Sequence, residues 1–597
     1  MRIGVDTGGT FTDLVADDGR VVKVPSTPDD PTQALRAALD GAGAGPDAEL
    51  LAHGTTVATN ALLQGSGARV ALVTTKGFAD VIEIARQARP SLYDPMADRP
   101  PPLVPRDLRV EIGGRLDGRG REIEPLDASR MPELPAAVDA VAVCLLHADL
   151  DAGHEQQVAK ELVARGLDVT CSHEVSPEFR EYERIVTTVA NALLRPVCRE
   201  YLRGLEGLAR EVLVMTSAGG LVPVAEAAER PAALLLSGPA GGMRAAAAIA
   251  AACGYPDAVS FDMGGTSTDV CLVRGGVPEP APTRTVAGYP IRLPALDIHT
   301  IGAGGGSLAR LDAGGALVVG PESAGAVPGP ACYGRGGEQA TVTDADLVLG
   351  RIPADATFAG LGRLDEQAAQ RALERARVAA DGVVTVVDAA MERAVRVVTV
   401  ERGVDARGLA LVAFGGAGPL HACAIAGALG MRAVIVPPRA GVLSAVGLVC
   451  SPRQRELVRS WPEPLQHGGI DRVLDALAEE AAALVLHGDA AGDVEVERLV
   501  DCRYAGQSHE LTVTSPDAFP VEHERRNGFA RPGAPVEVVA LRVRARRPAP
   551  LTPAELPPID RRSLRGPEVV AEPDCTVWVP DGWRADPGPL GAWVLRQ

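Results

Sequence analysis

Short apolar runs separated by glycine, proline and small polar residues recur along the chain and predict alternating strands and helices. Residues 70–74 and 141–146 are continuous apolar runs of the length typical of strands buried in a sheet. A helix is predicted to begin at Asp30-Pro31, where a capping residue precedes proline at the first helical position. Another helix is predicted over 181–208, bridging two lobes. This alternation indicates the α/β class.

One polar pattern interrupts the apolar runs twice. Residues 6–13 and 262–269 both read Asp-x-Gly-Gly-Thr-x-Thr-Asp, and each copy lies between two strand-like runs. Adjacent glycines allow backbone N–H groups to approach a phosphate, threonine hydroxyls add donors, and an aspartate at a strand end can hold Mg²⁺. A plain glycine hairpin also explains a single copy. Two copies in the same context favour a duplicated fold whose lobes close on one polyphosphate, as in actin-like ATPases.

A third glycine-rich segment follows a buried-strand pattern at 409–414 and precedes a helical pattern at 420–426. This strand, turn and helix predict a surface for adenosine, although a tight strand–helix turn explains the segment equally well. The glycines within 302–307 partly resemble a dinucleotide-binding turn, but no clear helix and second strand follow them. We therefore interpret them as a phosphate-facing loop or a hinge. The sequence contains no GxxxxGK[ST] pattern.

These segments give a set of predicted site residues. Asp6 and Asp262 are predicted to be catalytic and to hold the metal ion. We expect Asp13 and Asp269 only to tie their hairpins together by hydrogen bonds. The predicted nucleotide-binding residues are Gly8, Gly9, Thr10, Thr12, Gly264, Gly265, Thr266, Ser267, Gly302, Gly304, Gly415, Gly416 and Gly418.

Composition narrows the possible partners of the chain. Its 597 residues are enough for about two to four domains, and its formal net charge is −18. An acidic protein repels nucleic acid, so a bound nucleotide must rely on local dipoles and a bound cation. The ten cysteines show no CxxC pair, and the ten histidines show no HxxxH or HExxH pair, so no zinc site is indicated. No apolar signal follows Met1, and the longest apolar stretch is broken by Pro239 and Arg244, so we expect a cytoplasmic protein without a membrane segment.

Further motifs occur between and after the hairpins. They are His53-Gly54-Thr55-Thr56-Val57-Ala58-Thr59-Asn60, the segment 86–94, Ser237-Gly238-Pro239-Ala240-Gly241-Gly242, and the segments 320–326, 328–334, 341–346 and 503–511. Together with the hairpins, in this order and over nearly the whole chain, they resemble the hydantoinase A/5-oxoprolinase family. The region after Leu448 is short for that family, which puts C-terminal contacts with other subunits in doubt.

The resemblance implies a duplicated actin-like ATPase core of the heat-shock-chaperone and sugar-kinase superfamily, with a cleft between the lobes. It implies ATP-driven opening of a lactam or cyclic imide, with Mg²⁺ and a separate hydantoinase B-type subunit, and hence a hetero-oligomer. Subunits of acetone and acetophenone carboxylases resemble the chain too, so an ATP-dependent ketone carboxylase subunit is the first alternative. A non-enzymatic, ATP-gated scaffold is the second.

The substrate side is predicted from the two motifs that an ATP clamp does not need. Its predicted residues are His53, Thr55, Thr56, Asn60, Arg86 and Arg89. His53 also fits a structural residue at a helix entry, and the two arginines also fit a solvated helix end. The expected organisation is a first lobe over 1–190, a second lobe over 191–452, and a smaller α+β domain over 453–597, with a helix near 470–485 and a strand at 536–543.

Overall fold

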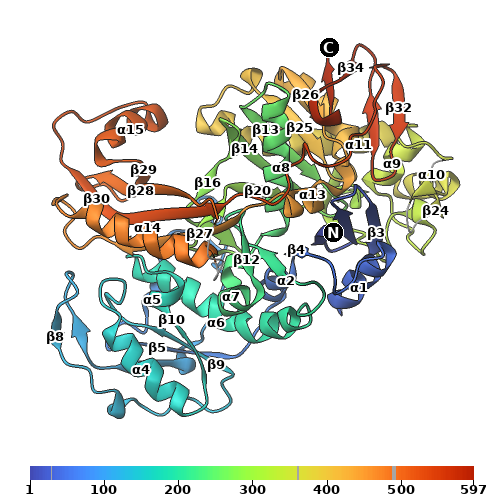
Figure 1. Ribbon diagram of the computed structural model, residues 1–597. Coiled ribbons are helices and arrows are strands. Elements are labelled where there is room, and N and C mark those ends of the chain that lie inside the picture. Colours follow the sequence, from blue (N-terminus) through green and yellow to red (C-terminus); the bar gives the residue numbers. More distant parts are fainter. Residues whose placement is uncertain (28–29, 356, 359–361, 487–491) are drawn as a thin grey trace.

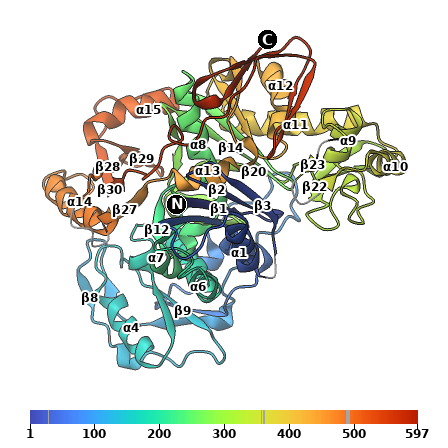
Figure 2. The same cartoon turned by 45° about the vertical axis from the view of Figure 1, so that its right-hand side comes forward.

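A computed structural model of the chain describes residues 1–27, 30–355, 357–358, 362–486 and 492–597. It is a mixed α/β protein with two large sheets and a smaller one (Figure 1). The N-terminus lies in the middle of the molecule, and the C-terminus lies at its periphery. In the second view, the hairpin β1–β2 lies between the helices α6 and α7 and the strands β14 and β20 (Figure 2).

The first sheet has ten strands and contains the N-terminus. In spatial order they are β29 (Leu511–Val513), β28 (Glu495–Tyr504), β30 (Val536–Arg547), β27 (Arg453–Ser460), β12 (Leu221–Pro223), β11 (Val212–Met215), β4 (Leu50–Thr55), β1 (Arg2–Thr7), β2 (Phe11–Ala16) and β3 (Val21–Pro25). β1, β4 and β11 run parallel to one another, so their carboxyl ends share one edge of the sheet.

The second sheet carries the second copy of the glycine pattern. Its strands are β15 (Val277–Pro278), β14 (Thr268–Arg274), β13 (Ala258–Met263), β25 (Ala410–Phe414), β26 (Ala433–Val436), β35 (Trp593–Arg596), β34 (Arg584–Pro587) and β31 (Leu564–Arg565), with β20 (Ile298–Ile301) also paired to β14. The third sheet is parallel and consists of β10 (Asp168–Cys171), β9 (Ala140–Cys144), β5 (Val70–Thr75) and β6 (Arg109–Ile112).

Helices cover these sheets and connect them. They are α1 (Pro31–Gly41), α2 (Val57–Gln64), α3 (Val81–Ile84), α4 (Gly153–Ala164), α5 (Ser172–Val175), α6 (Glu181–Arg203), α7 (Val224–Glu229), α8 (Gly238–Ala252), α9 (Val342–Val348), α10 (Glu366–Ala376), α11 (Ala380–Val398), α12 (Gly418–Leu429), α13 (Leu443–Val449), α14 (Ile470–Leu486) and α15 (Phe519–Asn527). Short hairpins complete the fold: β7 (Arg115–Leu116) with β8 (Glu122–Glu124), β17 (Arg284–Val286) with β18 (Tyr289–Ile291), β21 (Ser307–Leu311) with β22 (Leu317–Ser323), β16 (Pro280–Ala281) with β19 (Ala295–Leu296), β23 (Thr357–Phe358) with β24 (Gly362–Arg363), and β32 (Glu568–Ala571) with β33 (Thr576–Val579).

The two large sheets contain the same local arrangement. β1 pairs antiparallel with β2 and parallel with β4, and β13 pairs antiparallel with β14 and parallel with β25. Asp6 lies opposite Asp13, and Asp262 lies opposite Asp269. A helix follows the third strand in each case, α2 after β4 and α12 after β25. The sequence repeat is therefore also a structural repeat of hairpin, parallel strand and helix.

Helices α8 and α13 pack closely against each other because glycine lies at their contact. A Cβ atom on Gly447 would lie 1.8 Å from the carbonyl oxygen of Gly241, so a larger residue would force the helices apart. α13 also lies directly on β1, where a Cβ on Gly4 would lie 2.1 Å from the carbonyl oxygen of Ala445. Both helices belong to the continuous apolar core around the second sheet. Close packing of this kind fixes the position of β1 relative to α8.

The local predictions are confirmed, except that the helix expected over 181–208 ends at Arg203 and the strand expected over 141–146 ends at Cys144. Asp30 caps α1 and accepts a hydrogen bond from the Thr32 N–H, and α14 and β30 form where a helix and a strand are expected. Pairing crosses the expected boundaries at 190 and 452: β11 and β12 join the first sheet, and β35 joins the second. Hydrophobic periodicity identifies a strand but not its partner. The strands β28, β29 and β30 enclose a separate apolar core with the helices α14 and α15.

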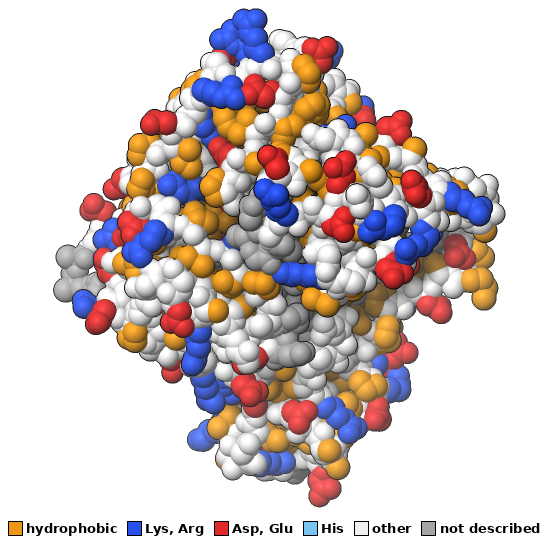
Figure 3. All heavy atoms as spheres, turned by 90° about the vertical axis from the view of Figure 1, so that its right-hand side faces the viewer, with side chains coloured by type: hydrophobic (Ala, Val, Ile, Leu, Met, Phe, Trp, Pro, Cys, Tyr) orange, Lys and Arg blue, Asp and Glu red, His pale blue; other side chains and the backbone are white. Residues whose placement is uncertain are grey.

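The surface and the helices bear on possible partners. On the face shown in Figure 3, Lys and Arg side chains are interspersed with Asp and Glu side chains and do not gather into one patch of a single sign. Among the described helices, none has the combination of length and apolar character that a bilayer crossing requires.

Candidate active site

The turns of the two glycine hairpins, which belong to the two large sheets, lie close to each other. A Cβ atom on Gly265 would lie only 3.8 Å from Oγ1 of Thr10, although the two residues belong to different sheets. Gly9, Gly265 and Thr266 are exposed, and the space around Gly9 is open. The structure therefore brings the two predicted phosphate hairpins together on an accessible space.

Both turns close in the same way and leave the same group free. The Gly8 N–H donates to the carbonyl oxygen of Phe11, and the Gly264 N–H donates to that of Ser267, each at 3.0 Å. Among the described residues, the N–H groups of Gly9 and Gly265 have no hydrogen-bond partner. Free N–H groups at facing turns form a concave site for an anion.

Asp6 lies one residue before the end of β1 and carries a buried polar atom without a hydrogen-bond partner among the described residues. Its Oδ1 atom is buried and forms no hydrogen bond in the described part of the chain. Two glycines allow the approach of their segments to this atom, since a Cβ on Gly54 would lie 2.9 Å from it and a Cβ on Gly238 would lie 3.8 Å from it. A buried carboxylate oxygen without a donor is costly, so this atom fits a ligand that supplies positive charge.

The third glycine-rich segment reaches the second aspartate. Gly415 has φ = +80°, and a Cβ there would lie 2.4 Å from Oδ1 of Asp262. Only glycine combines this backbone conformation with this contact. The Ala417 N–H donates to the carbonyl oxygen of Met263 at 2.9 Å, which joins the turn to the end of β13. Gly416 is exposed, and Gly418 begins α12.

The loop 302–306 supports the second hairpin from behind. The Gly305 N–H donates to the carbonyl oxygen of Gly264 at 3.0 Å, and the Gly306 N–H donates to that of Gly265 at 2.6 Å. Thr343 holds the loop from the other side, because its N–H and its hydroxyl both donate to the carbonyl oxygen of Gly305 at 2.8 Å. Gly304 is buried in this contact, whereas Gly302 is exposed.

Four carboxylates and one lysine set the charge of the site. Burial raises the pKa of Asp6 to about 7, with a further contribution from Asp13. Burial and the charges of Asp269 and Asp6 raise the pKa of Asp262 well above its usual range. Burial also raises the pKa of Asp269 to about 6 and raises that of Asp13. The raised pKa values mean that the ionised carboxylates are unfavourable on their own. A bound cation would stabilise them, because it removes their mutual repulsion.

Lys23 is a member of this group that the sequence analysis missed. It lies on β3 opposite Asp13, and its Nζ donates to Asp13 Oδ1 at 2.7 Å and lies 5.0 Å from the centre of the Phe11 ring. Its charge lowers the pKa values of Asp6, Asp13 and Asp262. The pairing of β2 with β3, which places Lys23 opposite Asp13, is the signal that could have identified it. In the second hairpin the Thr300 hydroxyl donates to Asp269 instead.

Three helices begin beside the hairpins. α2 follows Thr56, α12 begins at Gly418, and α8 begins at Gly238, where a Cβ would lie 3.8 Å from both the Asp6 carboxylate and the Thr56 methyl group. The N-terminus of a helix carries a partial positive charge and free N–H groups. This arrangement favours a bound anion between the hairpins, against the negative charge of the aspartates.

Several predicted residues support the site from behind. His53 is fully buried: its Nδ1–H donates to the carbonyl oxygen of Val5 at 3.1 Å, and its Nε2 accepts from the Tyr201 hydroxyl at 2.6 Å. Burial lowers the pKa of His53 to about 4, so the ring is neutral. Thr12 is also buried, and its hydroxyl lies 3.2 Å from that of Ser26. These side chains hold β1 and β2 in place and do not face the open space.

The remaining substrate-side residues separate into two groups. Thr56 lies near Asp6, since both contact the position of Gly238, and the exposed Asn60 donates through its amide to the Thr56 hydroxyl at 3.4 Å. Thr55 is buried and accepts from the Val57 N–H. Arg86 forms a bidentate ion pair with Glu183 on α6, at 2.8 and 2.5 Å. Arg89 is exposed and has no ion pair among the described residues. The structure thus brings Thr56 near Asp6 and joins Asn60 to Thr56, whereas Arg86 is paired with Glu183 instead.

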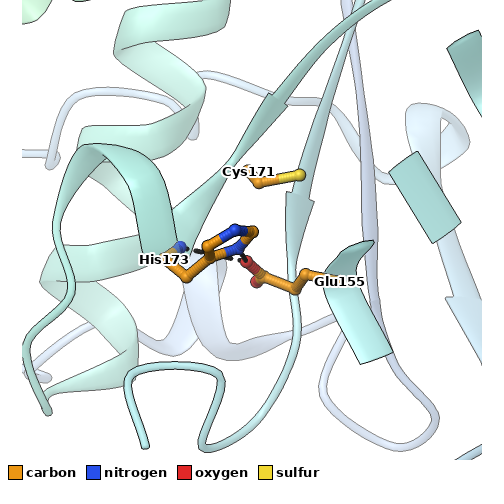
Figure 4. A group of neighbouring side chains, drawn as sticks. All are labelled: Glu155, Cys171 and His173. Carbon is orange, nitrogen blue, oxygen red and sulfur yellow. Dashed lines mark hydrogen bonds and ion pairs between the residues drawn. The ribbon is translucent and has the colours of Figure 1, made fainter. Parts of the chain in front are cut away.

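Another group of possible metal ligands lies at the edge of the third sheet and consists of Glu155, Cys171 and His173 (Figure 4). Its carboxylate, Glu155, is already satisfied: it accepts hydrogen bonds from the Leu145 N–H, the Ser172 hydroxyl, and the N–H and Nδ1 of His173. Burial raises the pKa of the Cys171 thiol, which disfavours the thiolate that a metal needs. We interpret this group as a structural link between β9, α4 and α5.

Comparison with known proteins places this geometry in a family. Two protein-family models match the chain. The one described as hydantoinase/oxoprolinase N-terminal region matches residues 2–166, and the one described as hydantoinase/oxoprolinase matches residues 184–456. The chain is also 34% identical to caprolactamase subunit alpha of Pseudomonas jessenii, over 100% of this chain and 99% of that protein. The chain belongs to the hydantoinase/oxoprolinase family. The first matched region holds the first hairpin, and the second holds the second hairpin and the turn at Gly415.

Relatives of the chain carry different names. The crystal structure of ATP-dependent caprolactamase from Pseudomonas jessenii superimposes with a TM-score of 0.85 and 31% identity, over 100% of this chain and 99% of that one. The chain is 34% identical to 5-oxoprolinase 1 of Arabidopsis thaliana, over 86% of this chain and 46% of that protein. It is 33% identical to the acetophenone carboxylase gamma subunit of Aromatoleum aromaticum, over 86% of this chain and 78% of that protein.

Proposed function

We propose that the chain is the ATP-dependent subunit of an enzyme that opens a lactam or a cyclic imide of the hydantoin or 5-oxoproline type. The observation that carries this proposal is the buried, unpartnered Oδ1 of Asp6 beside two facing glycine turns. Relatives of the same family named caprolactamase and 5-oxoprolinase act on cyclic amides by name, and the caprolactamase structure is titled ATP-dependent. We further infer that the duplicated hairpin units form an actin-like core with a cleft between the lobes.

The residues of the site fit Mg²⁺ and ATP. Asp6 and Asp262 would hold the cation, since burial and then the charges of neighbouring carboxylates raise their pKa values, and the charge of Lys23 only partly offsets this. The free N–H groups of Gly9 and Gly265 would hold phosphate oxygens, and the turn at Gly415 would lie against the adenosine. When bound, ATP supplies a phosphoryl group that makes an amide carbonyl reactive toward water.

The chain's own groups then position the substrate and move a proton. A carboxylate whose pKa is about 7 can take a proton from an attacking oxygen at neutral pH, which suits Asp6 to general-base work when it is not a metal ligand. Thr56 lies near it and Asn60 lies next to Thr56, so they would offer a hydroxyl and an amide for a cyclic amide substrate. The N-terminus of α8 would stabilise negative charge on the carbonyl oxygen.

A second polypeptide belongs to the proposal. The caprolactamase relative is named subunit alpha and the carboxylase relative is named gamma subunit, so both work in assemblies by name. We infer that this chain works with a hydantoinase B-type subunit as a hetero-oligomer in the cytoplasm, and that it acts on a small molecule and not on nucleic acid or a membrane. The net charge of −18 agrees with the exclusion of nucleic acid.

A ketone carboxylase subunit is the alternative, favoured by the 33% identity to the acetophenone carboxylase gamma subunit. Both functions need the same ATP site, so the hairpins do not separate them. They differ in what stimulates ATP turnover: a cyclic amide in one case, and a ketone with bicarbonate in the other.

The test is ADP release by the purified chain, with and without a B-type subunit, in the presence of 5-oxoproline, hydantoins, neutral lactams, or aryl ketones with bicarbonate. Asp6→Asn and Asp262→Asn should abolish stimulated turnover, whereas Asp47→Asn, a fully exposed matched control, should leave it unchanged. Stimulation by a ketone and bicarbonate alone would favour the carboxylase. ATP binding without stimulated turnover by any compound would overturn the enzymatic reading in favour of a scaffold.

A further inference from the structure

Arg244 is a cation without a counter-charge. It lies on α8, is half-buried, and forms no hydrogen bond or ion pair with the residues that the structure describes. Arg546 on β30 is also half-buried, and among the described residues the one hydrogen bond of its side chain is from Nε to Oε1 of Gln454, at 2.9 Å. Partly buried guanidinium groups are normally paired with a carboxylate or another anion.

A glycine turn lies near both arginines. The turn joins β11 to β12, and a Cβ on Gly219 would lie 3.1 Å from Cδ of Arg244. A Cβ on Gly220 would lie 2.2 Å from Cβ of Gln454, the residue that Arg546 contacts. Arg244 therefore lies on one side of the turn, and the Gln454–Arg546 pair lies on the other.

The positive charges of neighbouring arginines act on the pKa of Arg244. Burial, followed by the charges of Arg546 and Arg544, lowers the pKa of Arg244 to about 10. Arg544 is compensated by ion pairs with Glu456 at 2.9 Å and Glu497 at 3.0 Å. No such pair is found for Arg244 or Arg546 in the described part of the chain. The negative charges of Glu497, Glu456 and Glu495 act on Arg546 without an ion pair, whereas only the positive charges of Arg546 and Arg544 act on Arg244. A bound anion beside Arg244 would relieve this repulsion.

Arg244 lies near the glycine hairpins. The turn follows the carboxyl end of β11, and β11 is second from β1 in a set of parallel strands whose carboxyl ends share one edge. At the usual strand spacing this is about 10 Å from the strand of Asp6. Along the other path, α8 begins beside Asp6 and reaches Arg244 six residues later, about 9 Å along the helix axis. Both paths place Arg244 on the same edge as the candidate active site.

We propose that Arg244 and Arg546 form a binding site for a small oxyanion, a carboxylate or a phosphate, at the edge of the first sheet next to the hairpins. A guanidinium group binds such an anion through two parallel hydrogen bonds, which a lysine cannot reproduce. Two sources supply this chemistry: an anionic group of the substrate itself, or a free inorganic anion such as phosphate. The binding site is proposed independently of the reaction that the chain catalyses.

The first experiment measures thermal stability of the purified chain in sodium phosphate or sodium acetate against sodium chloride at equal ionic strength. Mg²⁺ and ADP are present throughout, so that phosphate does not report on the hairpins. We expect a saturable stabilisation that Arg244→Met and Arg546→Met each weaken at least tenfold in apparent affinity. Arg210→Met, which removes an exposed arginine, should leave it unchanged. Arg244→Lys, which keeps the charge, should bind the anions at least tenfold more weakly and serves if the methionine variant does not fold.

The proposal is overturned if the unaltered chain shows no anion-dependent stabilisation, or if the arginine variants retain it in full. A second experiment separates the sources and rests on the proposed function. If the substrate supplies the anion, Arg244→Met raises KM at least tenfold for 5-oxoproline and leaves KM unchanged for 2-pyrrolidone, the same ring without its carboxylate. If a free anion binds, added phosphate changes turnover of both rings alike. Should no ring be turned over, the proposed function fails while the thermal experiment still decides the binding site.

Discussion

Asp6 and Asp262 lie one residue before the ends of the equivalent strands β1 and β13, and the charge of Asp6, after burial and the charge of Asp269, contributes to raising the pKa of Asp262. Each lies beside a glycine of the next parallel strand or the turn that follows it, Gly54 in one case and Gly415 in the other. The duplicated unit therefore delivers two carboxylates to one place from opposite sides. A divalent cation between them would relieve their repulsion and tie the lobes together.

Cation binding is expected to depend on pH, because a proton competes for Asp6. The pKa of Asp6 is about 7 in the folded chain, so Mg²⁺ binding should weaken as pH falls below 7, by up to tenfold per unit for this one group. Calorimetric titration of the chain with Mg²⁺ and ADP between pH 5.5 and 8.5, a range of about three units around that pKa, measures this. Asp6→Asn should remove the contribution of Asp6 to this dependence, leaving those of Asp262 and Asp269, and should abolish substrate-stimulated turnover, a loss on the order of 100-fold or more. A flat pH profile in the unaltered chain would contradict the assignment.

The stability of the chain without ligand should change in the opposite sense. Asp6 has its pKa raised from 3.8 to about 7, so its protonated form is favoured in the folded state, and the free energy of unfolding is lost as pH rises through this window. Asp6→Asn should therefore stabilise the ligand-free chain at pH 8 by about 1–3 kcal/mol. Denaturant unfolding at pH 5 and pH 8 measures both effects, and no gain at pH 8 would mean that the carboxylate is not buried in solution.

Lys23 is expected to set the pH at which the cation binds. Its charge lowers the pKa values of Asp6, Asp13 and Asp262, so Lys23→Met should raise all three and move the midpoint of Mg²⁺ binding to higher pH. The same calorimetric titration detects this shift. Lys76→Met, which removes an exposed lysine, is the matched control and should leave the midpoint in place. An unchanged midpoint in Lys23→Met would show that Lys23 serves the hairpin alone.

Gly415 and Gly416 offer a test of the third glycine segment with a control one residue away. Alanine at Gly415 would be strained at φ = +80° and would collide with the Asp262 carboxylate, whereas a Cβ at Gly416 meets nothing within 4 Å. Gly415→Ala should cost about 1–3 kcal/mol of stability and weaken ATP binding at least tenfold, measured by unfolding and by nucleotide titration. Gly416→Ala should change stability little. Equal effects of both substitutions would show that the contact with Asp262 does not matter.

How far the sequence predicts the site depends on the sequence distance of each contact. The hairpins could be found because paired glycines and flanking strands specify a turn locally. The joining of β11 and β35 to sheets begun far away in sequence could not, since hydrophobic patterns carry no information about the partner strand. The orientation of His53 depends on Tyr201, 148 residues later, and that of Arg86 on Glu183, 97 residues later. Such contacts decide whether a polar residue faces a ligand or the core.

His53 is expected to support β1 and not to bind substrate. Its ring links the backbone of Val5 to the hydroxyl of Tyr201 inside the core, so His53→Gln and Tyr201→Phe should each reduce the free energy of unfolding by about 1–3 kcal/mol. Burial lowers the pKa of His53 from 6.5 to about 4, so the unaltered chain should lose stability as pH falls from 6.5 toward 4, and His53→Gln should lack this part of the loss. Once folded, either variant should keep an unchanged KM for the substrate, because the side chain is closed off from the space between the hairpins. A large rise in KM without loss of stability would instead place His53 in contact with the substrate.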